Sequence, residues 1–478
     1  MTDETNEGRT TDEQDTPSEP STESGGGNEN QQTDNDSVVT DSGETAVGTG
    51  NGTGRRAVVV DGVRTPFVKA FGPYLEMDTI ELGTEAVGGL LDQNEVPRNE
   101  LDKIVWGSVI VPGYAPNVAR EIALDMNLTE LEGKTVSRAC ASGLQSVTDA
   151  VAAIERGNAD VVIAGGSDST SNAEIKLPQK LTRSLAKVSY GKQDPAEILG
   201  ILSQLTPITD LLPKAPEIAE RTTGEVMGEA AERMAERHGV SREEQDEFAV
   251  RSHHRAAEAI ASGRFDDEVT PVETPDGEWV HRDRIVRGDT DVEQLSRLSP
   301  AFKKNGTLTA ANSTPLTDGA ASVLLMSEEK ADELGIEPKA AFKSWSYCGV
   351  DPSDQLLMGP ALALPEALND AGMVLDDLDL IDLHEAFAAQ VLCVLRMLES
   401  DAFARRWLDR EEAAGSVDMD KLNVHGGSVA IGHPFAATGA RMTTTMANEL
   451  SQESEQTAGL GICAAGGLGA GAIMESVS

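Results

Sequence analysis

The chain has 478 residues, of which 25% are charged and 4% aromatic, and its formal net charge at pH 7 is −42. Acidic residues occur along the whole length, so the composition excludes nucleic acid or an anionic membrane surface as a partner. No run of about 18 apolar residues and no apolar signal segment occurs, which predicts a cytoplasmic protein without a membrane span. The acid excess is typical of a halophilic protein, because a high-salt cytoplasm screens the self-repulsion.

The N-terminal segment, residues 1–54, contains 13 acidic residues, one arginine and no aromatic residue. Such a segment cannot bury a core, so we predict a disordered acidic tail; no motif supports the alternative, an interaction arm. From Arg55 onward strands alternate with helices, which predicts an α/β fold. The expected strands are 57–61, 104–110 and 159–166, and the expected helices are 79–91 and 117–126.

A strand that turns sharply into a helix carries Cys140 at its corner. Apolar residues recur at helical spacing from Leu144 to Ile154, so a helix should begin within one or two residues of the thiol. Backbone N–H groups and the helix dipole favour a thiolate at such a place, and the small residues around it let a substrate approach. The pattern predicts a nucleophile. A buried structural cysteine, the commoner fate of a single Cys, remains the alternative.

Residues 173–297 interrupt the alternation of strands and helices. They contain several prolines, two amphipathic helices at 228–238 and 241–262, and a polar stretch at 274–294. We predict an inserted domain that covers the substrate site. The stretch 308–326, a loop of small polar residues followed by a buried strand, returns the chain to the first core, so residues 298–334 are assigned to the N-terminal half together with 55–172.

After Gly335 the pattern of the first half repeats. Each half also contains a strand that ends in a pair of glycines, Gly165-Gly166 in the first and Gly466-Gly467 in the second. We infer a duplicated α/β unit whose second copy is 335–478. In this copy we expect strands at 340–345, 380–384 and 459–463 and helices at 360–371 and 432–450.

Three loops of the second half follow strand ends, and each carries one ionisable side chain, His384, His433 or Cys463. If the halves pack about a pseudo-dyad, these loops and the Cys140 turn converge on one pocket. Two thiols and an imidazole can supply a nucleophile, its base and a proton donor for a carbon acid. Each residue has a structural alternative: His433 could cap a helix, Cys463 could be core, and His384 could pair with Glu385. Together, at glycine-flanked strand ends, they favour catalysis.

The remaining cysteines and histidines are interpreted as structural. Cys393 lies in an apolar helix, Cys348 lacks a glycine turn, and the adjacent His253 and His254 cannot share a helix face as ligands. The four cysteines form no disulfide framework and no metal-binding spacing. The glycine-rich run 467–471 lacks the helix and the acid of a dinucleotide loop, so we do not interpret it as one.

Over residues 55–478 the sequence resembles the thiolase family. The resemblance implies the duplicated thiolase-type fold with five layers, α-β-α-β-α, and an inserted loop domain. It also implies that Met227, of a Met-Gly pair, and Thr314 lie along the pantetheine part of a CoA substrate. The motifs that carry it are the nucleophile turn 137–143, the loop 312–319, the histidine block 432–439 and the second-cysteine block 463–467.

One block departs from most of the family, which has Asn-Glu-Ala-Phe where this chain has His384-Glu-Ala-Phe. This block is similar to that of the β-subunits of fatty-acid oxidation complexes, as are 227–235 and 309–319. The resemblance therefore implies an acetyl-CoA C-acyltransferase, a 3-ketoacyl-CoA thiolase of fatty-acid β-oxidation. Its alternatives are a biosynthetic acetoacetyl-CoA thiolase and a non-catalytic subunit that binds CoA esters.

The resemblance also assigns roles and partners. Cys140 is the expected nucleophile, His433 its base and Cys463 the acid and base at carbon, while His384 and His433 donate to the enolate oxygen. The expected substrates are 3-ketoacyl-CoA, acetyl-CoA and CoA, with no metal or nucleotide cofactor. A homodimer or homotetramer is implied, and the oxidation-complex branch pairs with a hydratase/dehydrogenase subunit.

Overall fold

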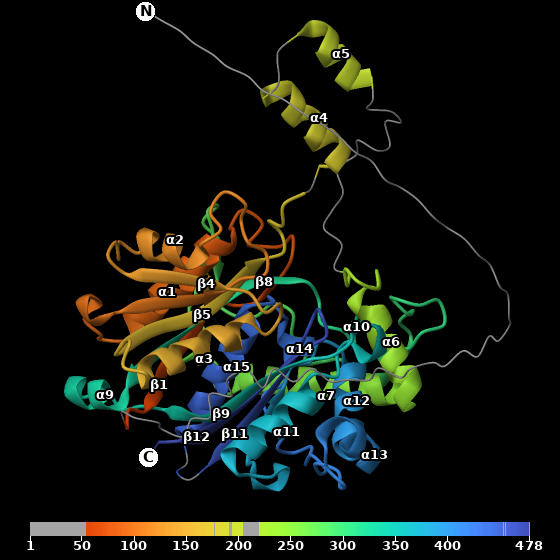
Figure 1. Ribbon diagram of the computed structural model, residues 1–478. Coiled ribbons are helices and arrows are strands. Elements are labelled where there is room, and N and C mark those ends of the chain that lie inside the picture. Colours follow the sequence, from red (N-terminus) through yellow and green to blue (C-terminus); the bar gives the residue numbers. More distant parts are fainter. Residues whose placement is uncertain are drawn as a thin grey trace, which may run out of the picture. The chain divides into compact units, whose positions relative to one another are not determined.

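The strands form one large mixed sheet and a separate short ribbon in a computed structural model of the chain (Figure 1). The structure describes residues 54–175, 177–190, 194–203, 219–452, 454 and 456–477, so the predicted tail lies outside the described residues except for Gly54. The strands of the sheet are β1 (Ala57–Arg64), β2 (Val68–Lys69), β3 (Lys103–Gly107), β4 (Glu132–Val136), β5 (Val161–Ser169), β8 (Thr317–Ser327), β9 (Ala340–Gly349), β10 (Leu380–Leu383), β11 (Thr457–Ala464) and β12 (Leu468–Ser476). The ribbon pairs β6 (Val272–Glu273) with β7 (Trp279–Val280).

Strand pairing repeats between the two halves. In the first half β3 pairs parallel with β5, and β5–β8 and β8–β1 pair antiparallel. In the second half β10 pairs parallel with β11, and β11–β12 and β12–β9 pair antiparallel. The two central strands, β1 and β9, join the halves through Val58–Ala341 and Val59–Ala340. The predicted duplication is therefore present in the order and direction of the strands.

Helices cover both faces of each half and make five layers, as predicted. α1 and α2 cover the first half, α11 and α12 cover the second, and α3 and α15 pack together between the two. The helices are α1 (Thr79–Gln93), α2 (Val118–Asp125), α3 (Ser142–Glu155), α4 (Gln179–Tyr190), α5 (Pro195–Ser203), α6 (Met227–His238), α7 (Arg242–Ala261), α8 (Val292–Ser296), α9 (Glu328–Leu334), α10 (Pro352–Gln355), α11 (Pro360–Ala371), α12 (Ala388–Leu398), α13 (Asp401–Phe403), α14 (Ser428–Ile431) and α15 (Ala437–Leu450). Short 3-10 turns lie at Arg98–Glu100 and Leu375–Asp377, and a π turn lies at Ala404–Leu408.

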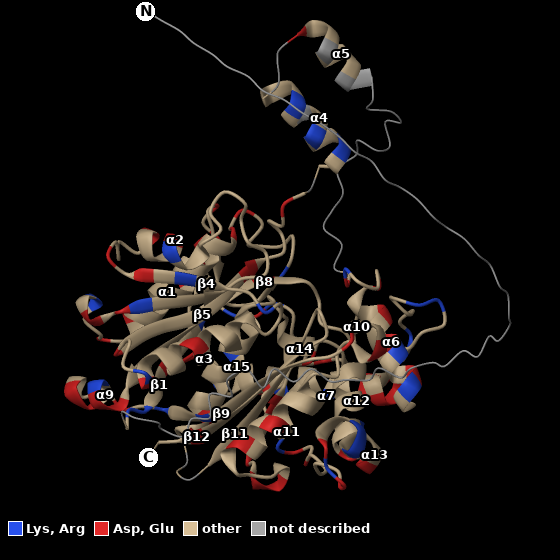
Figure 2. Cartoon of the chain, viewed as in Figure 1, with Lys and Arg blue, Asp and Glu red and all other residues tan. Residues whose placement is uncertain are grey.

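The β1 strand shows why the central strands are apolar on both faces. Val58 and Val60 pack into the cluster beneath α1, whereas Ala57 and Val59 pack into the middle cluster with α3 and α15. A strand that is buried on both sides cannot alternate apolar with polar residues, so its sequence is a continuous apolar run. Charged side chains gather instead on outer helices such as α6 and α9 (Figure 2).

Several expected boundaries differ from the structure. The strand expected at 104–110 ends at Gly107. The Ser108 N–H still donates to Val136 of β4, but the N–H groups of Val109 and Ile110 donate to buried Asp168 instead of to a strand. The helix expected from Gly432 begins at Ala437, after the separate turn α14.

The predicted equivalence of the two glycine pairs is wrong. Gly165 and Gly166 lie inside β5, which continues to Ser169, and a Cβ on either glycine would overlap neighbouring atoms. Gly466 and Gly467 instead form the turn between β11 and β12, with φ of 82° and 69°. Close packing requires the first pair, and a left-handed turn requires the second.

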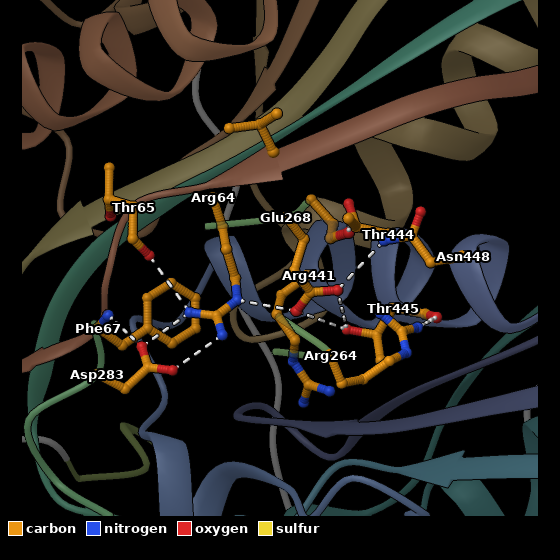
Figure 3. Close-up of polar contacts among 12 residues, drawn as sticks. Arg64, Thr65, Phe67, Arg264, Glu268, Asp283, Arg441, Thr444, Thr445 and Asn448 are labelled. Carbon is orange, nitrogen blue, oxygen red and sulfur yellow. Dashed lines mark hydrogen bonds and ion pairs between the residues drawn. The ribbon is translucent and has the colours of Figure 1, made fainter. Parts of the chain in front are cut away.

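Arg64 at the end of β1 is the centre of a buried ionic cluster (Figure 3). Its guanidinium donates to both oxygens of Asp283 at 2.8 and 2.9 Å and to Glu268 at 3.2 Å. Glu268 also accepts from Thr445 of α15. Burial alone would lower the pKa of Arg64, but Asp283 and Glu268 raise it above its usual value, so the cluster stays charged. It ties the segment 268–283 to β1 and to α15.

We predict that Arg64→Met lowers the free energy of unfolding by about 3–5 kcal/mol, because it leaves two carboxylates buried without their cation. The control is Lys103→Met, which removes the exposed Lys103–Glu132 pair and should cost about 1 kcal/mol or less. Denaturant unfolding of both variants at one salt concentration measures the difference. Equal losses in the two variants would contradict a structural role of the cluster.

Candidate active site

Cys140 lies at a sharp corner between β4 and α3. Ala139 adopts φ of 47°, which few residues other than glycine tolerate, and α3 begins two residues after the thiol. Ser142 holds the corner, since its hydroxyl accepts from the Arg138 N–H at 2.7 Å and donates to the Ala139 carbonyl at 2.6 Å. The predicted start of the helix is therefore confirmed.

The expected thiolate at Cys140 is wrong for the free protein. Burial raises the pKa of this thiol to about 12 and outweighs the backbone N–H of Ala465, which donates to the sulfur and lowers the pKa. The negative charge of Asp168 raises the pKa further. The start of α3 does not overcome these effects, so Cys140 is a neutral thiol that needs a base to become a nucleophile.

Cys463 lies at the end of β11, buried beside the first thiol. Burial raises its pKa well above the usual value, and the neighbouring Cys140 raises it further. The Gly466-Gly467 turn follows immediately and returns the chain into β12. A neutral thiol at this position can donate a proton. Like Cys140, it is not a thiolate at rest.

His433 lies in the turn that precedes α15. Its Nδ1 is 2.6 Å from the hydroxyl of Thr438, and its backbone N–H donates to Thr317 at 2.8 Å. Burial lowers the pKa of the imidazole to about 3, with a smaller effect of Arg441. The other ring nitrogen, Nε2, is buried and has no hydrogen-bond partner among the described residues. His433 is thus a neutral imidazole with one free nitrogen.

His384 follows β10 and lies against His433. The two ring centroids are 4.1 Å apart with an interplanar angle of 44°. Its Nδ1 is 3.0 Å from the Ser428 hydroxyl, and in the described part of the chain its buried Nε2 also lacks a partner. Burial lowers the pKa well below the usual value, and His433 and then Arg441 lower it further. Two neutral imidazoles therefore lie together, each with one nitrogen unpaired.

Close packing brings the Cys140 corner to the histidine turn. A Cβ on Gly143 would lie 2.2 Å from the carbonyl oxygen of Ala436, and one on Gly439 would lie 2.3 Å from the nitrogen of Leu144. Asp168 at the end of β5 reinforces this contact by accepting the Ala436 N–H at 2.8 Å. The structure thus groups the four predicted ionisable residues, two thiols and two imidazoles.

Of the two expected substrate-binding residues, Thr314 is linked to this group through Ser428. The Thr314 hydroxyl donates to the Ser428 carbonyl at 2.8 Å, and Ser428 is also the partner of His384. Met227 begins α6, is partly buried, and packs against the same apolar cluster that contains Cys463.

In the structure His384 does not pair with Glu385, which was the alternative interpretation. Glu385 accepts instead from Ser252, Asn423 and the Val429 N–H. It therefore joins α7 and the segment 423–429 to the loop that carries His384.

The sequence analysis missed three residues that hold the site. Thr438 and Ser428 each contact the Nδ1 atom of one histidine, and Asp168 accepts N–H groups from both halves. Thr438 lies inside the histidine block 432–439, and Ser428 follows a glycine pair, so a weak sequence pattern marks both residues. Asp168 had none beyond being an acid next to an apolar strand.

Comparisons with known proteins agree with this geometry. Residues 57–329 match the family model of the thiolase N-terminal domain, and residues 336–476 match that of the C-terminal domain. The chain belongs to the thiolase family. It is 46% identical over 428 residues to the 3-ketoacyl-CoA thiolases of Yersinia enterocolitica and Yersinia pestis, which covers 88% of this chain and 97% of each relative.

Solved structures show the same likeness at lower identity. Human mitochondrial 3-ketoacyl-CoA thiolase has a TM-score of 0.75 and 29% identity, with 89% of this chain and 99% of that chain covered. Bacillus anthracis acetyl-CoA acetyltransferase has a TM-score of 0.74 and 31% identity, with 88% and 99% covered. No described helix of this thiolase is long and apolar enough to cross a membrane.

We predict that the rate of Cys140 alkylation by iodoacetamide rises about tenfold per pH unit from pH 7 to pH 10 without a plateau, because only the thiolate reacts. Peptide mass spectrometry measures the label, and Cys140→Ser is the blank for that peptide. A small-molecule thiol treated in parallel should level off near its own pKa. A plateau of Cys140 labelling by pH 8 would mean that the resting residue is a thiolate.

Proposed function

We propose that this thiolase cleaves 3-ketoacyl-CoA with CoA to acetyl-CoA and a shortened acyl-CoA. The observation that carries the proposal is the grouping of two neutral thiols with two neutral imidazoles whose Nε2 atoms are unpaired among the described residues. Its relatives in Yersinia are 3-ketoacyl-CoA thiolases. Carbon–carbon cleavage needs a nucleophile, a base and a separate acid for a carbanion, and this set supplies all three.

The first half-reaction makes an acyl-enzyme. His433 takes the proton of Cys140 as the thiolate attacks the 3-keto carbon, and the bond between the α-carbon and that carbonyl carbon breaks. The bonding electrons pass to the enolate of acetyl-CoA, and Cys463 protonates its carbon. The low pKa of His433 and the high pKa of Cys140 place no charge in the resting pocket, so the ion pair forms only as the carbon is attacked.

The second half-reaction releases the acyl group. Cys463, now a thiolate, takes the proton of an incoming CoA thiol, whose sulfur attacks the thioester carbonyl on Cys140. The tetrahedral intermediate expels the Cys140 thiolate, which recovers its proton from His433. In this proposal neither half-reaction uses a metal or a nucleotide cofactor, and CoA is a substrate.

In each half-reaction an oxygen atom becomes negative and needs hydrogen-bond donors. The Nε2 atoms of His384 and His433 face no other described partner and can donate to the enolate oxygen, directly or through a water. The Ala465 N–H, which lowers the pKa of Cys140, is the proposed donor to the acyl-enzyme oxygen. Met227 and Thr314 are the proposed contacts of the pantetheine chain.

The cellular setting is proposed on composition and resemblance. A net charge of −42 fits a halophilic cytoplasm. The resemblance to β-subunits of oxidation complexes supports a role in fatty-acid β-oxidation. The resemblance supports a homodimer or homotetramer and, as in oxidation complexes, a hydratase/dehydrogenase partner subunit.

A biosynthetic acetoacetyl-CoA thiolase is the second candidate, because the chain is 31% identical to an acetyl-CoA acetyltransferase of known structure. The same residues would then run the reaction toward condensation of two acetyl-CoA molecules.

The function is tested by thiolysis of acetoacetyl-CoA beside a long-chain 3-ketoacyl-CoA. We predict kcat/KM at least as high for the long chain and, without free CoA, an acyl label on Cys140. Turnover of acetoacetyl-CoA alone would favour the biosynthetic candidate. No turnover of either, by a folded protein that still binds CoA esters, would overturn both in favour of a non-catalytic subunit.

We predict that His384→Ala lowers kcat for thiolysis roughly 10²–10³-fold, because it removes one oxyanion donor. His384→Asn keeps a donor and should retain intermediate activity. Acyl labelling of Cys140 by a saturated acyl-CoA, which forms no enolate, should remain in both variants, since His433 is the proposed base. If His384→Ala turned over like the parent across the pH range, the enolate donors would have to be sought elsewhere.

A further inference from the structure

One carboxylate of the inserted segment reaches the turn that follows Cys463. Oε2 of Glu220 accepts the backbone N–H of Gly466 at 3.0 Å. The other oxygen, Oε1, accepts the N–H and the hydroxyl of Thr222 at 3.1 and 2.8 Å. Glu220 is only 7% exposed.

Local hydrogen bonds fix the backbone around Glu220. Its N–H donates to the Glu225 carbonyl and its carbonyl accepts the Gly224 N–H, both at 2.8 Å. Gly224 adopts φ of 74°, and Ala219 pairs with Val226 across the loop, so the chain closes a tight turn directly before α6. The Glu220 carboxylate therefore projects from a fixed backbone. Burial would raise its pKa, but the hydrogen bonds donated by Thr222 and Gly466 lower it and have the larger combined effect.

The turn that receives this carboxylate has little rigidity of its own. Three residues connect β11 to β12, and two of them, Gly466 and Gly467, have positive φ. Glycine has the widest choice of backbone conformations, so such a turn must be held from outside to keep one. The Gly467 carbonyl is held by the Val350 N–H at 2.8 Å, and the Gly466 N–H is held by Glu220.

The neighbouring amide in this turn faces the nucleophile. The Ala465 N–H lies close enough to Cys140 to lower the pKa of its thiol, and Ala465 is joined by one peptide bond to the Gly466 N–H that Glu220 holds. Rotation of the peptide plane between Ala465 and Gly466 changes the backbone torsion ψ of Ala465 and so can move the Ala465 N–H. The contact of Glu220 thus constrains the position of a donor that lies against the reacting sulfur.

We propose that Glu220 is a positioning residue of the active site: its hydrogen bond to Gly466 fixes the turn so that the Ala465 N–H points at the oxygen of the acyl group on Cys140. The inference rests on the proposed function, because only a reaction through an acyl-enzyme uses that donor. It makes the inserted segment a part of the catalytic machinery through the second-cysteine turn, in addition to the contacts of Met227.

Substitutions of Glu220 should reduce acyl transfer more than substrate binding. Glu220→Ala leaves the Gly466 N–H without its acceptor, and we expect kcat for thiolysis and the rate of Cys140 acylation to fall roughly 10–100-fold, the scale of a misplaced catalytic group. KM for CoA should change less than about threefold, because the turn is not a proposed CoA contact. Glu220→Gln keeps one acceptor oxygen and should lie between Ala and the parent.

The matched control is Glu225→Gln in the same loop. The Glu225 side chain pairs with Arg233 on the half-exposed side of the loop and does not contact the turn. This variant should acylate at the parent rate. Iodoacetamide labelling of Cys140 should be unchanged in Glu225→Gln and should fall slightly in the Glu220 variants, because the Ala465 N–H lowers the pKa of that thiol. A general loss of folding would instead expose the thiol and raise its labelling.

Hydrogen exchange of the peptide that spans residues 460–470 tests the contact independently of activity. We expect the Gly466 amide to lose protection in Glu220→Ala and to keep it in Glu225→Gln. Unchanged protection, or acylation of Glu220→Ala at the parent rate, would overturn the inference. A parent enzyme without thiolysis would sink the proposed function instead, and the exchange result would still decide whether Glu220 holds the turn.

Discussion

The first turns of α3 and α15 lie side by side because Gly143 and Gly439 have no side chains at their contact. A Cβ at Gly143 or at Gly439 would enter the backbone of the opposite helix. The approach places the Cys140 corner of one half against the histidine turn of the other, and Asp168 closes the contact by accepting the Ala436 N–H. The two halves could each fold as an α/β layer without these glycines, but the thiol and the imidazole would then be separated by at least a side chain.

Burial gives the site its electrostatic character. It raises the pKa of both active-site thiols and lowers the pKa of both imidazoles, so each of the four groups is neutral at rest. Charges created during a reaction would appear beside buried side chains, where a fixed N–H is worth more than in solution. The unpaired Nε2 atoms and the Ala465 N–H are therefore suited to a transition state more than to the resting enzyme.

The sequence specified the parts of this site that depend on local pattern. Helical spacing after Cys140 placed the start of α3, and repeated element order predicted the duplication that strand pairing confirms. It did not specify side-chain partners that meet only in three dimensions, such as Ser428 beside His384. The thiolate was predicted wrongly for a related reason: a helix N-terminus can be read from sequence, whereas the depth at which it is buried cannot, and at Cys140 burial has the larger effect.

The acidic surface and the buried charges respond differently to salt. At about 1 M salt the screening length in water is roughly 3 Å, so repulsion among exposed acids is nearly removed. The buried pairs Arg64–Asp283 and Arg441–Asp382, each with an N–O distance of 2.8 Å, exclude ions and keep their strength. Arginine serves at both positions, and it suits them because a guanidinium is less strongly hydrated than an ammonium; Arg64 also bonds Asp283 through two N–H groups. Salt can therefore change the solubility of this chain while the burial that lowers the pKa of both histidines, and the smaller effect of Arg441, remain the same.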